Sequence, residues 1–588
     1  MALGSRSSIP NRVEYLMKLT KLLTGGCLLL AIPVVAQDSS GTAPKEPPVD
    51  TAPHSALPRS PRAAPNACAV LLSELKGLVF VSRPEAVVKA GVSTPGIAFK
   101  DVPVPKPDVL EGLISPYLGH VFTRGQLNEL IEKVIVYYRH HDRPVVDVFA
   151  PEQDITTGTI QVVILEGHVG KITTTGNRWF PNREIREGVR LQPGDPIRSS
   201  ELQEDLDWLN ANPFRNTDAV YRPGAQLGAT DIEFRTQDRF PLRLYAGYDN
   251  DGNAVTGLSR YDVGLNFADP GLGKQVNFEY TTSGEDLHAE SGSCIIPLPW
   301  RNTLTFFGNY TQTRGAIPPY LGIAGRSDQI SGRYSVPLST LETDLVAYKH
   351  TVAAGFDYKY NDNTLEFGGL PAGGALYAVD QFVLSYNGSL SDPHGRTTLD
   401  FKGYLSPGHW GGNNTSAAFN AAHTRAASSY TYGTLALERL IRLPAEWSVV
   451  VRGTLQLSNS NLAPSEQMGF GGYDTVRGYE ERVANADQGT LTTVEIRSPD
   501  FCLGRHLHRA GWVDDWQLLA FWDEGTAFNH TLLPNEPRET RLESLGAGLR
   551  ASVSTYATLR LDWGYRLLAV GSDSRCGSTC DVSFVVSY

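Results

Sequence analysis

The chain has 588 residues, a formal net charge of −11 and 20% charged residues. This length indicates several domains. The negative charge argues against a nucleic-acid partner, because nucleic-acid sites are basic. After the N-terminal region, no apolar run reaches the roughly 18 residues that a membrane-spanning helix needs, so none is expected.

The first two segments predict secretion into the periplasm. Residues 1–36 place basic residues before the apolar stretch Leu22–Val35 and end in small residues that suit cleavage, which is the pattern of a signal peptide. The stretch is too short for a membrane anchor, and Met17 is an alternative start. Residues 37–70 are rich in Pro, Ala, Ser and Thr, so we expect a flexible periplasmic linker.

Residues 71–167 and 168–238 predict two small α+β modules with the same order of elements, β-α-α-β-β. In the first module we expect a strand at 75–81, helices at 108–116 and 126–141, and strands at 145–148 and 159–165. In the second we expect a strand at 169–175, helices at 181–189 and 199–210, and strands at 216–222 and 230–236. Ser199 or Ser200 is expected to cap the helix at 199–210.

Residues 239–588 alternate between apolar and polar side chains up to the C-terminus. In the last segment Val582, Phe584, Val586 and Tyr588 share one face, with polar or small residues between most of them. About sixteen such segments predict an antiparallel transmembrane β-barrel with lipid outside and polar groups inside. A soluble β-sandwich explains this count less well. An even strand number places both barrel ends, and the two modules, in the periplasm of a Gram-negative-type bacterium.

The six cysteines indicate no metal site. Cys576 and Cys580 lie four residues apart in a Gly/Ser-rich loop, where a small disulfide is possible in an oxidising compartment. No histidine lies near them, and two thiolates do not complete a zinc site. We therefore predict neither a metal nor another cofactor.

Two short motifs suggest a contact inside the barrel. Val476-Arg477-Gly478-Tyr479 lies in a glycine-rich loop at about 458–488, and Phe521-Trp522-Asp523-Glu524-Gly525 ends a strand. Leu519, Phe521 and Asp523 are expected to face the lumen, where the carboxylate would seek a cation such as Arg477. From the spacing alone, a solvated loop arginine and a carboxylate that caps the strand end would be the better interpretation.

The two motifs, the two modules and the terminal barrel together resemble the Omp85 superfamily. More closely, residues from about 70 to 588 resemble the outer-membrane transporters of two-partner secretion, the family of haemolysin and filamentous haemagglutinin exporters. The resemblance implies that the modules are POTRA domains that bind a secreted polypeptide. It also implies a sixteen-stranded barrel whose sixth extracellular loop folds inward. The loop motif Val476, Arg477, Gly478 and Tyr479 would then meet the strand motif Phe521, Asp523 and Gly525.

The resemblance leaves some details open. Many of these transporters carry an N-terminal helix that plugs the pore, but residues 38–66 are too proline-rich to predict one. Tyr588 stands where phenylalanine is commoner in outer-membrane proteins, and it keeps the aromatic character expected for insertion by the barrel-assembly machinery.

The predicted function is therefore export of a partner polypeptide, an adhesin or haemolysin-like protein. No nucleotide-binding motif occurs, so export without nucleotide hydrolysis is expected. An alternative is an Omp85-type factor that assembles other outer-membrane barrels, although such factors tend to have more than two modules. An enzyme is disfavoured because no Gly-x-Ser-x-Gly or His-Glu-x-x-His element occurs and the paired Asp514-Asp515 is expected in a polar loop. A passive porin would not need the modules.

Overall fold

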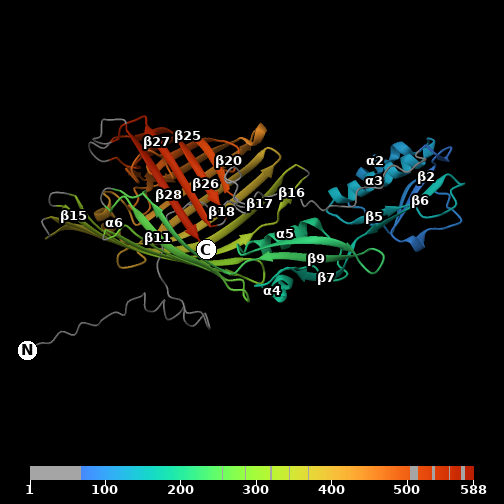
Figure 1. Cartoon of the computed structure of the whole chain (residues 1–588), viewed down its shortest axis with the longest axis horizontal. Coiled ribbons are helices and arrows are strands. Elements are labelled where there is room, and N and C mark those ends of the chain that lie inside the picture. The colour runs from blue at the N-terminus through green and yellow to red at the C-terminus, as the bar shows by residue number, and fades with distance from the viewer. Residues whose placement is uncertain are drawn as a thin grey trace, which may run out of the picture.

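The computed structural model places two small α+β units in line with one end of a large barrel (Figure 1). The C-terminus lies at that same end of the barrel. The predicted signal peptide, most of the predicted linker and Cys576 lie outside the described residues. Cys580 is an exposed free cysteine, so the structure gives no support to the predicted Cys576–Cys580 disulfide. The structure describes residues 68–253, 256–284, 286–317, 321–343, 345–367, 370–503, 514–532, 537–554, 556–570 and 577–588.

The first unit packs two helices on a sheet with the order β3-β2-β6-β5. Its elements are β1 (Val70–Leu72), β2 (Gly77–Val81), η1 (Pro84–Ala86), β3 (Gly96–Lys100), α2 (Pro107–Ile114), η2 (Ser115–Tyr117), β4 (Phe122–Thr123), α3 (Arg124–His140), β5 (Val146–Phe149) and β6 (Thr159–Glu166). Helix α3 begins with a capping box in which the Thr123 hydroxyl accepts from the Gln126 amide and the Gln126 side chain accepts from the Thr123 amide. Buried Phe80, Leu130 and Tyr138 form part of the core between sheet and helix.

Three short strands of this unit, β1, β3 and β4, were not predicted from the sequence. They have three, five and two residues. In strand β3 the alternating apolar pattern consists of only two residues, Ile97 and Phe99. The strand pairs in parallel with the buried strand β2. A stretch this short carries too little period-two signal to be separated from a loop.

The second unit has the predicted order of elements and a three-stranded sheet, β7-β9-β8. Its elements are β7 (His168–Thr175), α4 (Asn182–Glu187), α5 (Ser199–Asn210), β8 (Arg215–Pro223) and β9 (Ala229–Asp238). The predicted serine cap of α5 is wrong. Arg198 is the N-cap residue and makes no side-chain cap bond. Instead Asp142 of the first unit accepts hydrogen bonds from the amide and hydroxyl of Ser200, at 2.7 and 2.8 Å, and so joins the units.

The described part of the barrel closes through sixteen long antiparallel strands, as predicted, with β28 pairing back to β10. The two-residue β16 adds only a short pairing at the start of β17. Strand β17 extends well beyond the segment predicted at 342–352, whereas β18 nearly coincides with the segment predicted at 373–391. The strands are β10 (Leu242–Asp249), β11 (Arg260–Ala268), β12 (Gln275–Thr282), β13 (Leu287–Pro297), β14 (Thr303–Ile317), β15 (Leu321–Pro337), β16 (Leu341–Glu342), β17 (Ala347–Phe367), β18 (Leu370–Asp392), β19 (Gly395–Pro407), β20 (Ser429–Arg442), β21 (Ser448–Ser458), β24 (Gln488–Arg497), β25 (Asp514–Phe528), β26 (Thr540–Val553), β27 (Ala557–Arg566) and β28 (Ser578–Ser587).

The connections between barrel strands contain a few further elements. These are α6 (Ser416–Ala422), η3 (Pro444–Glu446), β22 (Met468–Phe470) and β23 (Ala484–Ala486). None of the helices in the described part of the chain has the length and the hydropathy to cross a bilayer.

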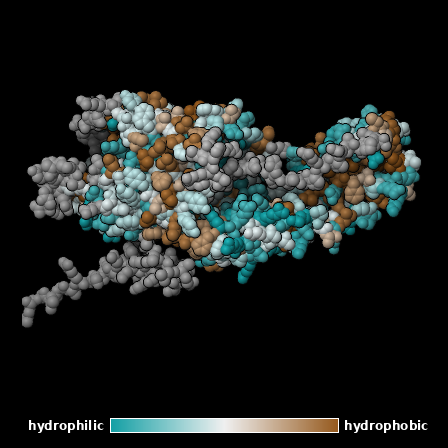
Figure 2. Space-filling model, viewed as in Figure 1, coloured by the Kyte–Doolittle hydropathy of each residue, from teal (hydrophilic) through white to brown (hydrophobic). Residues whose placement is uncertain are grey.

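Alternate barrel residues face opposite environments. On β27 the Trp563 side chain is 50% exposed, while the preceding Asp562 is fully buried. On β25 Leu518 is exposed and Leu519 is buried. The outward apolar side chains gather over the barrel wall, and hydrophilic side chains cover much of the second unit (Figure 2). This is the arrangement of a barrel with lipid outside and polar groups inside.

The second unit is fixed to the barrel through an ion-pair cluster around a buried aspartate. Fully buried Asp205 on α5 contacts Arg301, in the turn between β13 and β14, at 2.6 Å and Arg190 at 2.8 Å. The Arg301 guanidinium also donates to the carbonyl oxygen of Gly188 at 2.7 Å. Phe180 and Phe214 of the unit pack against Ala268 of the barrel. These contacts position the second unit at the mouth of the barrel.

Candidate functional site

The candidate site is the long loop between β21 and β24, residues 459–487, which folds against the inner wall of the barrel. Strands β22 and β23 pair within it and make it a hairpin. Gly471 and Gly472 have φ angles of 96° and 100°, a conformation that side chains with a Cβ rarely adopt, and they turn the chain into the tip. Phe470 and Val476 are fully buried.

Arg477 and Asp523 lie in direct contact at the loop tip. The Arg477 Nε and Nη2 atoms donate to the two carboxylate oxygens of Asp523 at 2.7 and 2.8 Å. The Arg477 backbone amide also donates to the carboxylate, at 3.2 Å. The side chain of Asp523 is fully buried and that of Arg477 is 4% exposed. A bidentate pair of this kind is both strong and directional.

Two further carboxylates complete the surroundings of Arg477. Glu495 of β24 accepts from Nη1 at 2.8 Å, and Asp562 of β27 lies 3.8 Å from the same nitrogen. The guanidinium carbon lies 3.4 Å from the centre of the Phe521 ring, which adds a cation–π contact. The loop tip therefore carries one cation into a ring of acids supplied by separate strands.

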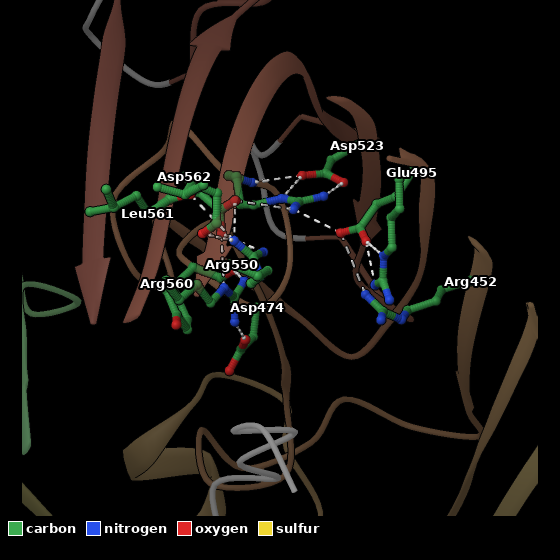
Figure 3. Close-up of polar contacts among 12 residues, drawn as sticks. Arg452, Asp474, Glu495, Asp523, Arg550, Arg560, Leu561 and Asp562 are labelled. Atoms are coloured by element: carbon green, nitrogen blue, oxygen red, sulfur yellow. Dashed lines mark hydrogen bonds and ion pairs between the residues drawn. The ribbon is translucent and has the colours of Figure 1, made fainter. Parts of the chain in front are cut away.

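The neighbouring carboxylates have arginine partners of their own (Figure 3). Glu495 accepts from Arg497 at 2.5 Å. Asp562 accepts from Arg550 at 2.9 Å and from Arg560 at 2.8 Å. These arginines balance most of the buried negative charge, whereas among the described residues the Asp523 carboxylate accepts hydrogen bonds only from Arg477.

Glycines on the barrel wall make room for the tip. A Cβ at Gly564 would lie 2.6 Å from the backbone nitrogen of Gly478, so backbone rests directly on backbone. A Cβ at Gly525 would lie 2.9 Å from a Val476 methyl group. At Gly489 it would lie 2.4 Å from the Phe470 ring. Larger residues at these positions would hold the tip away from the wall.

Tyr479 ties the other side of the tip to the barrel. Its hydroxyl lies 2.7 Å from the Leu568 carbonyl oxygen and 3.0 Å from that of Glu543. The amide of Glu543 lies 3.2 Å from the same hydroxyl oxygen. The ring is buried together with Val476 and Phe470.

The structure thus brings Val476 and Arg477 of the loop motif against all three residues of the strand motif. Gly478 and Tyr479 contact other parts of the wall, at Gly564 and at the Glu543 and Leu568 carbonyl oxygens. Sequence reasoning did not single out Glu495 and Asp562 as partners of Arg477. A signal was present, since both are acids on the lumen face of predicted strands. What the sequence lacked was the position of those strands around the barrel.

The other singled-out residues lie away from this cluster. The Tyr588 backbone exchanges two hydrogen bonds with Leu244 at the seam between β28 and β10, and its side chain is 92% exposed. The prediction that Asp514 lies in a polar loop is wrong. It begins strand β25 and accepts from the Leu503 amide and the Trp516 indole. The described residues contain no group of three metal-binding side chains.

Comparisons with known proteins agree with this architecture. Residues 228–515 match the family described as haemolysin secretion/activation protein ShlB/FhaC/HecB, and residues 94–167 match the POTRA domain of ShlB type. The heme/hemopexin transporter protein HuxB of Haemophilus influenzae is 20% identical over 458 residues, which cover 76% of this chain and 78% of that protein.

Other similarities cover less sequence or the fold alone. The hemolysin transporter protein ShlB of Serratia marcescens is 33% identical over 100 residues, 17% of each chain. The structure of CdiB from Escherichia coli has a TM-score of 0.69 at 15% identity and covers 90% of this chain and 92% of its own. CdiB from Acinetobacter baumannii has a TM-score of 0.61 at 14% identity, with coverages of 88% and 90%.

Proposed function

This chain belongs to the haemolysin secretion/activation family ShlB/FhaC/HecB, and from that premise we propose how its parts act in export. Members of the family are transporters, and the chain is an outer-membrane β-barrel that exports a partner polypeptide, with its two α+β units in the periplasm. The proposal concerns which residues receive that polypeptide and which control its passage.

The two periplasmic units are proposed to receive the partner polypeptide as an added strand. Strands β3 and β5 are the edges of the first sheet, and β7 and β8 are the edges of the second. An edge strand offers unpaired backbone groups, and main-chain pairing tolerates varied sequence. The cluster around Asp205 holds the second unit at the barrel mouth, so a chain bound there would lie close to the pore.

The polypeptide is then proposed to cross the barrel in extended form. Because a nucleotide-binding motif is absent from the sequence, direction would come from folding outside the cell, which removes the extended chain from the equilibrium. The exposed Tyr588 ring at the seam is proposed to serve recognition by the barrel-assembly machinery.

The Arg477–Asp523 pair is proposed to hold the loop in a resting conformation that the exported chain must rearrange. The observation that carries this proposal is the bidentate contact at 2.7 and 2.8 Å between an arginine and an aspartate that are both buried in the barrel. This pair of buried opposite charges holds the loop tip in one position, because movement of the tip would leave the Asp523 carboxylate buried without its cation.

The test is export by the variant Arg477→Ala at matched abundance in the outer membrane. We expect export of the partner to fall strongly while the barrel still inserts, as judged by heat-modifiable migration on gels. Arg439→Ala is the matched control, because Arg439 also makes a bidentate pair, with Asp392, but at the periplasmic end of β20 and away from the loop. Normal export by Arg477→Ala would refute the proposed role.

A further inference from the structure

A second charged residue of the same loop is as deeply buried as Arg477 and has the opposite sign. Glu466 lies in the first arm of the loop, ahead of the tip, and its side chain is fully buried. One carboxylate oxygen accepts from Lys359 Nζ at 2.8 Å and from the Ser465 hydroxyl at 2.9 Å. The other accepts from Gln381 Nε2 at 3.0 Å and from the Tyr432 hydroxyl at 2.8 Å.

These partners belong to a different part of the barrel wall from those of the tip. Lys359 lies on β17, Gln381 on β18 and Tyr432 on β20, whereas Arg477 contacts β24, β25 and β27. The Glu466 carbonyl oxygen also accepts from Gln456 on β21, at 3.1 Å. The loop is therefore fastened at two places along the ring of strands.

The charge arrangement at the two places is reciprocal. At the tip the loop supplies the cation and the wall supplies the carboxylates, while at Glu466 the loop supplies the carboxylate and the wall supplies the lysine. A buried carboxylate without donors is strongly unfavourable, so the three donors that the wall supplies to Glu466 define where the first arm lies. Gln456 donates in addition to the Asp487 carbonyl oxygen at 3.1 Å and so holds the end of the second arm at the same point.

We propose that Glu466 is a second anchor of the loop, a positioning residue that keeps the first arm on β17, β18 and β20 when the tip has left Asp523. The proposal rests on the export function proposed above, because it assigns a further residue to the control of the same pore. Release of the tip alone then leaves the lumen partly filled, and the loop clears it only when both anchors have opened.

The experiment measures ion conductance of the purified full chain in planar bilayers of phosphatidylethanolamine and phosphatidylglycerol. The variants are Arg477→Ala, Glu466→Gln and their combination, with Glu524→Gln as the matched control. Glu524 is ion-paired with Arg541 on the barrel wall, at 2.6 Å. We expect the combined variant to spend at least about tenfold more time at high conductance than either single variant. Each substitution removes hydrogen bonds to a charged group that stabilise the closed state, and the combined variant lacks both sets.

A charge exchange separates positioning from a general structural role. In the Arg477→Ala background, Glu466→Lys places two ammonium groups together and is expected to open the channel. Adding Lys359→Glu restores an opposite pair and is expected to return the conductance to that of Arg477→Ala alone. A purely structural role would lower the thermal stability of each variant without this rescue.

Two results would overturn the proposal: a combined variant no more conductive than Arg477→Ala, or a charge exchange that fails to restore the conductance of Arg477→Ala while the barrel unfolds at its normal temperature. Export of the partner is measured in parallel. If Arg477→Ala exports normally while the conductance pattern holds, the proposed role of the tip fails and the second anchor stands.

Discussion

Replacing Arg477 by alanine is expected to free the loop tip mainly because it leaves the Asp523 carboxylate without a cation. The substitution removes three charged hydrogen bonds of 2.7 to 2.8 Å. Glu495 keeps Arg497, and Asp562 keeps Arg550 and Arg560, so the unbalanced charge is that of Asp523.

The expected loss of stability of the closed loop follows from the fact that only Asp523 loses its cation. Removing one partner of a buried ion pair costs about 3–5 kcal/mol, and the lower end applies here because the backbone amide at position 477 still donates to the Asp523 carboxylate. A cost of about 3 kcal/mol raises the open fraction of the tip roughly 150-fold. Adding Asp523→Asn removes the unpaired charge, so the double variant should retain only about 1–1.5 kcal/mol of the defect, or roughly tenfold.

Hydrogen exchange of the backbone amides in residues 473–482, followed by mass spectrometry, measures this opening directly. Exchange in this segment should be fastest in Arg477→Ala, intermediate in the double variant and slowest in the unmodified protein. Arg439→Ala should leave it unchanged. If the double variant exchanges as fast as Arg477→Ala, the unpaired carboxylate is not the source of the instability and the reasoning is refuted.

Two other substitutions test how the loop and the second unit are seated. Gly525→Val should displace the tip, because the new Cβ would lie 2.9 Å from a Val476 methyl group. It should therefore reduce both export and the protection of the tip amides from hydrogen exchange. The control Gly453→Val should change neither, because a Cβ at Gly453 meets no atom within 4 Å. Asp205→Ala should loosen the second unit by leaving Arg301 without its carboxylate, which lies at 2.6 Å. Faster proteolysis between β9 and β10, with an unchanged barrel melting temperature, is the expected readout, and equal cleavage rates would contradict it.

The sequence by itself determined which side of the barrel wall each residue faces. In β27 and β28 the alternation separates Trp563 and Phe584, which face outward, from Asp562, which faces inward. This information is local, because successive residues of a strand point to opposite sides whatever the strand pairs with. A local pattern needs enough residues to be recognised. The sixteen long barrel strands were therefore predicted, whereas the five-residue β3 was missed.

Only the tertiary structure decided which inward residues meet. Arg477 reaches carboxylates on β24, β25 and β27, and Glu466 reaches β17, β18 and β20, because the barrel closes and the loop turns back into it. Closure and register depend on hydrogen bonds between strands far apart in the chain, such as those of β28 with β10. A period-two pattern assigns a residue to the lumen face, but it does not say where on the circumference that residue lies or which charge faces it.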